Sequence, residues 1–540
     1  MLKKMARLLP LGLLGLMVGM GPAWGQGAAQ LRDVSPGDWA YGALRDLSDR
    51  YDCLKGYPDG TFRGNRALSR YEFAAALNAC LQGIEGLLVG QGDTATAADL
   101  AVIERLIREF NTDLAVLRGR IDGMTARVAE LEASQFSTTT KLQGEAIFAL
   151  NTNLGGRAIT GITRNGARIP TEPVLQYRTR LDLHTSFTGR DRLRTRLMGS
   201  SAVPMLADQG NTGGPNAANL LFSNDGRLAM DTSTVQRNTN NVVLDLLSYT
   251  HPLGEATELT LFAAGGSHFH YADTLNPYLE DQEGGSGALS RFGQRNPIYG
   301  LGGDGAGFGV SHRAGESLRF DLGYLANQGA TPQRGLFGAD YSLLAQAVVG
   351  GDRAQLGLTY VHGYSTANRF RFGGSGTATG SFSANLIPLA LNANSSRPFG
   401  DPLFNRPVVS NSYGLGGMVQ PSAGIALSGW VGVTKARLLE VGDGEIWNYA
   451  LTVAFPDLGG AGNLGMVVLG SEPTLRSLRA QGGRVNLLDT DPVWHIEAAY
   501  RYQVSDRIAI TPGILWLPAV NQNGGNDDVF ILSLQTQFKF

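Results

Sequence analysis

The sequence has few of the residues that build disulfide-bonded, metal-binding or highly charged proteins. It contains two cysteines among 540 residues, which excludes a disulfide scaffold and a cysteine-rich metal centre. Charged residues make up 17%, below the ~25% of a typical soluble domain. The formal net charge is −2, so the overall charge does not favour nucleic acid as a partner. No stretch approaches 18 consecutive apolar residues, so no membrane-spanning helix is expected.

The first 25 residues have the pattern of a secretory signal peptide. Three basic residues among the first seven precede an apolar run over residues 8–21. The sequence Ala23-Trp24-Gly25 then provides a small-x-small cleavage site. The apolar run is too short to span a bilayer, and an uncleaved anchor is the less favoured alternative. We therefore expect an exported protein.

Residues 26–82 are expected to form a small domain of two helices around a tight loop. Ser35-Pro36 begins the first helix, and the capping box at residues 69–72 begins the second. Dense turn chemistry lies between them at residues 56–61. Cys53 follows the first helix and Cys80 ends the second, so a disulfide would join the pair. Two separate buried thiols are the alternative.

This small domain resembles an S-layer homology (SLH) domain. The sequences LRDVSPGDWAYGALRDL (residues 31–47) and GYPDGTFRGNRALSRYEFAAALN (residues 56–78) carry the resemblance. It implies attachment to peptidoglycan or to a glycan linked to it. The family's usual TRAE reads SRYE here, with the arginine kept. The resemblance implies contact with the wall polymer for Trp39, Gly56, Asp59, Gly60, Thr61, Phe62 and Arg70. The alternative is that these residues serve the turn and the core alone.

After a linker over residues 83–98, residues 99–135 are expected to form a coiled coil. Apolar residues recur in steps that alternate between three and four from Leu100 to Leu131. A single amphipathic helix packed on a globular core is the alternative, but the strict period of 3.5 argues against it. The residues in the seam do not by themselves choose between a dimer and a trimer.

Residues 136–540 are expected to be mainly β, forming a 16-stranded antiparallel transmembrane barrel. Apolar and polar residues alternate within segments of about ten residues, as Phe530, Leu532 and Leu534 do with Ser533 and Gln535. Short turns alternate with long loops, which is typical of outer-membrane barrels. A soluble sandwich or a propeller is the alternative, but no repeat of 40–50 residues is visible. The segments lie near 141–150, 174–188, 191–201, 241–251, 255–266, 306–313, 316–327, 341–350, 351–362, 411–420, 421–434, 446–456, 461–470, 493–503, 506–516 and 528–540.

The complete arrangement resembles the SLH-bearing porins of cyanobacterial outer membranes, whose barrel belongs to the carbohydrate-selective (OprB-type) porin family. The resemblance implies a trimeric channel for passive diffusion of small solutes, which are sugars in some members and inorganic ions, including iron, in others. It implies no catalysis and no cofactor. The expected partners are outer-membrane lipid, cell-wall glycan, two further copies of the chain and small solutes. A mainly structural tether with a nearly closed barrel is the alternative.

Alternation also predicts a basic strip inside the barrel. Arg178 and Arg180 on one strand share the inward face with Arg192, Arg194 and Arg196 on the next. Asp182 lies on the same face and offsets part of the charge. A basic strip at a constriction favours anions over cations. In the alternative interpretation, loop carboxylates hold these arginines and the strip is a structural brace.

Two further patterns are weak. His268 and His270 share a strand face, but spacing supplies no third metal ligand, so no metal site is expected. The sequence Gly300–Gly305 matches G-x-G-x-x-G by letters, but a strand rather than a helix follows it. No G-x-S-x-G and no H-E-x-x-H occurs, so nothing in the sequence supports an outer-membrane enzyme.

Overall fold

The chain divides into two units, Met1–Ser134 and Gln135–Phe540, and the second unit holds every residue that the computed structural model describes. The described residues are 139–156, 169–208, 220–221, 223–232, 241–303, 305–338, 340–373, 378–387, 405–480, 483–484 and 490–540. The predicted wall-contact residues from Trp39 to Arg70, the Cys53–Cys80 pair and the predicted coiled coil lie outside the described residues.

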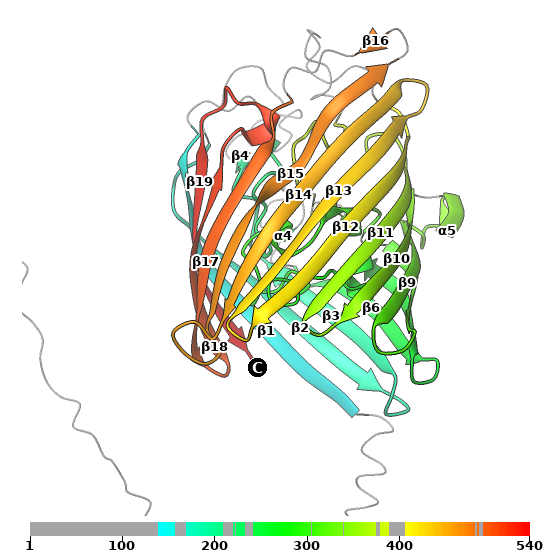
Figure 1. Ribbon diagram of the computed structural model, residues 1–540, viewed down its shortest axis with the longest axis vertical. Helices are drawn as coiled ribbons and strands as arrows, with labels where there is room; N and C mark the ends of the chain where they lie inside the picture. The colour runs from blue at the N-terminus through cyan, green and yellow to red at the C-terminus, as the bar shows by residue number, and fades with distance from the viewer. Residues whose placement is uncertain are drawn as a thin grey trace, which may run out of the picture. The chain divides into compact units, whose positions relative to one another are not determined.

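Sixteen antiparallel strands of the second unit form one closed barrel (Figure 1). The ring closes because β1 pairs with β2 on one side and with β19 on the other. The barrel strands are β1 (Thr139–Gly155), β2 (Val174–Ser186), β3 (Arg192–Ser200), β6 (Val243–Pro252), β7 (Thr257–Gly266), β8 (Gly305–Arg313), β9 (Leu318–Asn327), β10 (Asp340–Gly351), β11 (Ala354–Ser365), β12 (Val408–Ser422), β13 (Ile425–Leu438), β14 (Gly442–Pro456), β15 (Leu464–Ala480), β17 (Val493–Ser505), β18 (Ile508–Leu517) and β19 (Val529–Lys539). The predicted count and the order of the strands are confirmed.

The link between β13 and β14 is much shorter than the predicted segments 421–434 and 446–456 imply. Leu438 pairs with Gly442, so only three residues lie between the two strands. The charged residues around this link form cross-strand ion pairs. Lys435 pairs with Glu445, and the strands continue past it to the link. These ion pairs extend the strands beyond the apolar band.

Several short elements accompany the barrel. The long connections contain the small hairpin of β4 (Ala207–Asp208) and β5 (Leu220–Leu221), and the two-residue strand β16 (Gly483–Arg484) extends the end of β15. No helix in the described part of the chain is long and apolar enough to cross a membrane. The helical elements are η2 (His268–His270), α4 (Arg291–Gln294), η3 (Pro297–Gly300), α5 (Gly335–Gly338) and η5 (Val520–Gln522).

The barrel wall reverses the burial pattern of a soluble protein. On β2, Leu175 is 73% exposed, whereas its polar neighbours Gln176, Arg178 and Arg180 are buried. The outward faces of the other strands likewise carry exposed leucines, such as Leu358 on β11 and Leu451 on β14. An outward apolar band with a polar interior is the arrangement that a bilayer requires of a spanning barrel.

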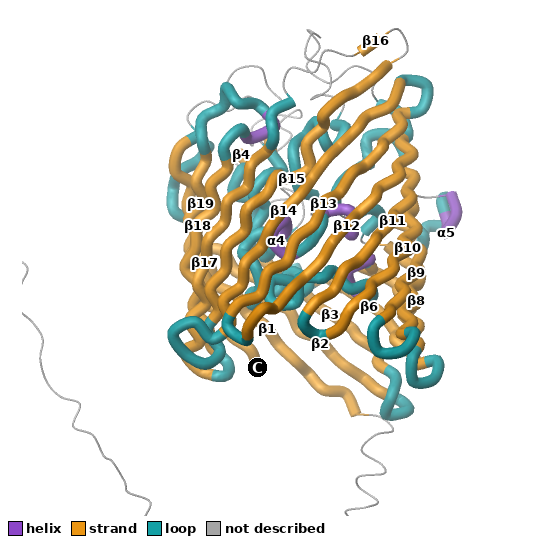
Figure 2. The backbone as a smooth tube through the Cα atoms, viewed as in Figure 1, coloured by secondary structure: helices purple, strands orange, loops and turns teal. Residues whose placement is uncertain are grey.

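Three segments from long connections fold into the barrel instead of leaving it empty. They are residues 223–232, residues 267–303 and residues 378–387, and we call them interior segments 1, 2 and 3. Figure 2 shows α4, which belongs to interior segment 2, lying within the ring of strands. Backbone bridges connect the three segments, with Asn224 paired to Gly380 and Leu228 paired to Ser290. The segments therefore form one connected filling.

Candidate functional site

The predicted basic strip lies on one wall of the barrel, formed by β1, β2, β3 and β6. Pairing between β2 and β3 places Asp182 opposite Arg196 and Arg180 opposite Met198. Pairing between β1 and β2 places Glu145 opposite Arg180. Because side chains alternate along each strand, these charged groups project from the same face of the sheet. We call this surface, together with the carboxylates of interior segment 2 that contact it, the charged wall.

Arg194 and Arg196 share the carboxylate of Asp182. The Arg194 Nε donates to Asp182 Oδ1 at 2.6 Å, and the Arg196 Nε lies 3.2 Å from both oxygens. Arg196 also lies 3.5 Å from the carboxylate of Asp245 on β6. Arg194 donates a further hydrogen bond to the side chain of Gln282 in interior segment 2, at 2.7 Å. Both guanidinium groups are therefore charge-compensated.

Arg178 and Arg180 hold interior segment 2 against the wall. Arg178 donates to the backbone carbonyls of Ala229 and Glu283 and lies 3.4 Å from Glu145. Arg180 donates to the carbonyl of Gln282 at 2.9 Å, and its guanidinium lies 3.9 Å from the Glu283 carboxylate. Since Arg178 and Arg180 are only 1% and 6% exposed, these contacts replace the water that the charges have lost.

Glu283 is the central anion of this site. The Nη1 atoms of Arg291 and Arg295 lie 2.6 Å and 3.3 Å from its Oε1. Burial alone would raise the pKa of Glu283, but Arg291, Arg295, Arg180 and Arg178 outweigh it and lower the pKa to about 2. The carboxylate therefore stays ionised at neutral pH and neutralises part of the arginine cluster. Arg295 also stacks over the ring of Phe269, 3.7 Å from its centroid.

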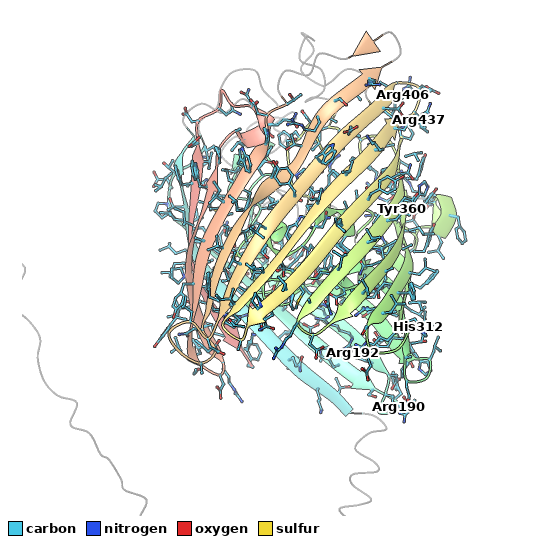
Figure 3. All side chains as sticks on the ribbon, in the orientation of Figure 1. Arg190, Arg192, His312, Tyr360, Arg406 and Arg437 are labelled. Carbon is cyan, nitrogen blue, oxygen red and sulfur yellow. The ribbon has the colours of Figure 1, made fainter. Side chains whose placement is uncertain are left out.

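Arg192 differs from the other four arginines of the strip. It is the first residue of β3, it is exposed, and it makes no ion pair within the described part of the chain. Figure 3 places it near the end of the barrel where the short turns lie, close to Arg190 in the turn before β3. Arg192 thus contributes positive charge that no carboxylate in the described residues neutralises.

Two cavities meet at the charged wall. The larger has a volume of about 580 Å³ and extends to the end of the chain at Lys539 and Phe540. The smaller has a volume of about 60 Å³, which leaves room for only a few water molecules. Arg180 and Arg196 line both cavities. The two side chains therefore stand at the narrow place between a wide mouth and a confined inner space.

The two histidines flagged in the sequence do not share a strand face. They lie in η2, after β7 has ended, and the buried ring of His268 contacts the hydroxyls of Tyr271 and Ser342 at 2.7 and 2.8 Å. Burial lowers the pKa of both His268 and His270 to about 3, so both rings are neutral at pH 7. Within the described residues, no group of three or more His, Cys, Asp or Glu side chains could hold a metal ion.

Sequence reasoning named Asp182 but did not identify the other carboxylate partners of the arginines. Glu283 and Asp245 lie 49 or more positions from the strip in sequence, and Glu283 belongs to a loop whose path no periodic pattern reveals. A loop rich in charge, residues 280–283, between two strands of a barrel was the available signal. The loop's direction, into the barrel or away from it, decides whether that charge reaches the wall.

The profile of the carbohydrate-selective porin, OprB family, matches residues 97–540, which is most of the chain and all of the barrel. This chain belongs to that family. The profile of the S-layer homology domain matches residues 30–74, so this porin carries an SLH domain before its barrel. A closed 16-stranded barrel, an outward apolar band and an SLH domain together place this porin in the outer membrane.

Two relatives match almost the whole chain. An uncharacterized protein of Nostoc sp. (strain PCC 7120) is 42% identical over 526 residues, covering 95% of this porin and 85% of the relative. An uncharacterized protein of Synechocystis sp. (strain PCC 6803) is 34% identical, covering 95% and 90%. The solved structure of Pseudomonas putida OprB covers 76% of this porin and 96% of its own chain, with 11% identity and a TM-score of 0.46.

Proposed function

We propose that this porin allows passive diffusion of small hydrophilic solutes and inorganic ions across the outer membrane. The observation that carries the proposal is the cavity of about 580 Å³ inside the barrel, lined by ionised and polar side chains and reaching the narrow place between Arg180 and Arg196. A polar cavity holds water, and water supports the movement of hydrated solutes. The confined inner cavity favours small ions over large solutes.

The balance of charge at the narrow place favours weak rather than strong selectivity. Four arginines of the predicted strip have carboxylate partners within 4 Å: Arg178, Arg180, Arg194 and Arg196. This arrangement supports the brace interpretation for these four. Arg192 remains as an uncompensated positive group near the mouth. We propose a mild preference for anions, with Arg178, Arg180, Asp182, Arg192, Arg194 and Arg196 lining the path.

Conductance in planar lipid bilayers tests the proposed diffusion. The purified full chain should give discrete ion-conducting steps, and vesicles that contain it should swell in small sugars or salts. The same protein unfolded by heating is the control, because it carries the same contaminants without a barrel. A folded barrel that conducts no ions and swells no vesicles would contradict the proposal.

We propose that the SLH domain ties the porin to peptidoglycan, and that three copies associate. We assign wall contact to Trp39, Gly56, Asp59, Gly60, Thr61, Phe62 and Arg70, and we propose that a disulfide joins Cys53 and Cys80. The full chain with Arg70→Ala should pellet less with purified peptidoglycan than wild type. Arg66→Ala, four positions away and outside the family pattern, is the matched control. The trimer is checked by the mass of the detergent-solubilised protein.

A second function, a mainly structural tether, is favoured by one observation. The three interior segments occupy much of the barrel, and the inner cavity beside Arg180 and Arg196 holds only about 60 Å³. A porin plugged in this way would still join the outer membrane to the wall. The bilayer measurement separates the two functions, because a tether would give a folded barrel that binds peptidoglycan without conducting.

A further inference from the structure

A second cluster of ionisable groups lies on β15 and β17, away from the charged wall. His495 is fully buried between two glutamates, with its Nδ1 2.8 Å from Glu472 Oε1 and its Nε2 3.3 Å from Glu497 Oε2. Both glutamates are also fully buried. The role proposed above for the charged wall does not use these groups. We call Glu472, His495 and Glu497 the clasp.

Each glutamate of the clasp accepts hydrogen bonds from the interior segments. Glu472 accepts from the backbone N–H of Gly226 at 2.8 Å and from that of Gly380 at 3.0 Å. These donors belong to interior segments 1 and 3. Glu497 accepts from the backbone N–H of Leu289 at 2.6 Å and from both the N–H and the hydroxyl of Ser290, which belong to interior segment 2. The clasp therefore contacts all three segments at once.

The backbone is shaped for these contacts. Gly226 and Gly380 have φ angles of +65° and +84°, a left-handed conformation that favours glycine. A Cβ on Gly226 would lie 2.3 Å from Leu517, and one on Gly380 would lie 2.6 Å from Pro473. The ladder between β14 and β15 shifts register beside Glu472, and the Pro473 carbonyl there accepts the Ser381 N–H at 3.1 Å. A bulge re-aims side chains in this way.

The contacts of the clasp fit a positively charged His495 between two carboxylates. An ionised carboxylate only accepts hydrogen bonds, so His495 needs a proton on both ring nitrogens to donate to both glutamates. The resulting imidazolium holds two carboxylates that would otherwise repel each other. Removing one member leaves buried charge or buried amide donors without a partner, which is costly.

Ser290, His495 and Glu472 are connected in the order of the catalytic triad of a hydrolase. The Ser290 hydroxyl lies 3.1 Å from His495 Nε2, and His495 Nδ1 contacts Glu472. The three residues lack the function of a triad. Ser290 is fully buried, and its hydroxyl donates to Glu497 and accepts from the Gly293 N–H at 2.9 Å. A substrate has no access to this oxygen, and its proton is directed to a carboxylate rather than to the histidine.

We propose that the clasp residues are positioning residues that hold the three interior segments against one wall and thereby set the open cross-section of the pore. Interior segment 2 also contacts the charged wall through Gln282 and Glu283, so this segment is held by two separate groups of strands. When the clasp is released, the filling loses the hydrogen bonds that Glu472 and Glu497 accept from it, while the barrel ladder stays paired. This proposal rests on the proposed function as a diffusion channel.

The test compares Glu472→Gln, Glu497→Gln and His495→Gln with wild type in planar bilayers, using the full chain. Conductance should rise by about twofold or more as the filling loosens, and vesicles should admit larger sugars than wild type admits. The matched control is Glu445→Gln on β14. That glutamate pairs with Lys435 and Trp447 instead of with an interior segment, so conductance should not change. Amide hydrogen exchange should accelerate at Gly226, Gly380 and Leu289 in the clasp variants.

A further variant covers the case in which a charge change prevents folding. Ser290→Ala leaves all three clasp residues in place and removes one hydroxyl donor to Glu497. It should change conductance and exchange in the same direction, by a smaller factor. Retention of the barrel is checked by the difference in migration between unheated and heated samples in detergent gels.

The outcomes separate this proposal from the proposed function. A conducting wild type with unchanged conductance and exchange in every clasp variant would overturn the clasp and leave the diffusion function standing. A wild type that conducts no ions, together with clasp variants that do conduct, would support the proposed role of the clasp. The same result would overturn diffusion through the unmodified protein. If neither wild type nor any clasp variant conducts ions, both the clasp proposal and the proposed diffusion function are overturned.

Discussion

Two walls of the same barrel hold interior segment 2 by opposite chemistry. On the charged wall, Arg180 projects from β2 and the carboxylate of Glu283 comes from the segment. On the wall formed by β15 and β17, the carboxylates of Glu472 and Glu497 project from the strands and backbone amides come from the segments. The first wall borders two cavities, and the second packs against the apolar groups Leu289 and Phe292.

This difference indicates a division of roles within one barrel. Charges beside a water-filled cavity act on passing ions, because their fields reach across a narrow pore within a Debye length of ~8 Å. Charges sealed among apolar side chains act on their own neighbours and fix the positions of backbone segments. We therefore expect changes on the charged wall to alter selectivity and changes on the wall formed by β15 and β17 to alter stability or pore size. Four predictions test this division.

The largest effect, a loss of stability, is expected from Phe292→Ala, where interior segment 2 packs against the wall formed by β15 and β17. Phe292 is 1% exposed and packs edge-on against Trp430, with ring centroids 5.7 Å apart. Removing a buried aromatic ring costs roughly 3–5 kcal/mol. Urea unfolding in detergent should show this loss, while the reversal potential stays at the wild-type value. Phe337→Ala is the control, because Phe337 is 83% exposed and its removal should cost about 0.5 kcal/mol or less.

A strong change of selectivity is expected when Arg192, Arg194 and Arg196 become Gln together. The triple variant leaves Asp182 and Asp245 without two of their partners, so the path becomes more negative. The reversal potential across a salt gradient should move from a mild anion preference toward cations. The control changes three arginines that lie away from the charged wall: Arg406, Arg437 and Arg476. Equal shifts in the two triple variants would assign the effect to net charge.

A change of opposite sign is expected from Glu283→Gln. Four arginines then lose their shared anion, which adds one uncompensated positive charge beside the inner cavity. The reversal potential should move toward anions, by less than the triple variant moves it toward cations. Glu316→Gln removes a carboxylate from an exposed turn and should leave the reversal potential unchanged. A shift toward cations in Glu283→Gln would contradict the role of the charged wall.

The smallest effect is a pH dependence that arises at Asp281. Burial, together with the nearby Glu145, raises the pKa of Asp281 to about 6. Acidification through pH 6 therefore neutralises a carboxylate that lines the larger cavity, and the wall becomes more positive. Anion preference should increase slightly between pH 7 and pH 5. Glu283, with a pKa of about 2, keeps its charge over this range. In Asp281→Asn the pH response should disappear.

Much of the barrel was predictable because its information is local. The period of two along each strand is fixed by the pleat, so exposed Leu175 beside buried Gln176 can be assigned to opposite faces without knowing any neighbour. The same rule placed Arg178 and Arg194 on one face. It failed at the link between β13 and β14, because the charged residues there have cross-strand partners, Lys435 with Glu445, that a single strand does not reveal.

The sequence by itself determined the strand count, the strand order and the inward face of the arginine strip, since each follows from alternation and from short turns between neighbours. Only the tertiary structure decided that three long connections enter the barrel. That choice depends on pairing between residues far apart in the chain, such as Gly226 with Glu472 and Arg178 with Glu283. Burial inside the barrel makes an unpaired amide or charge costly, so these distant contacts decide where the loops lie.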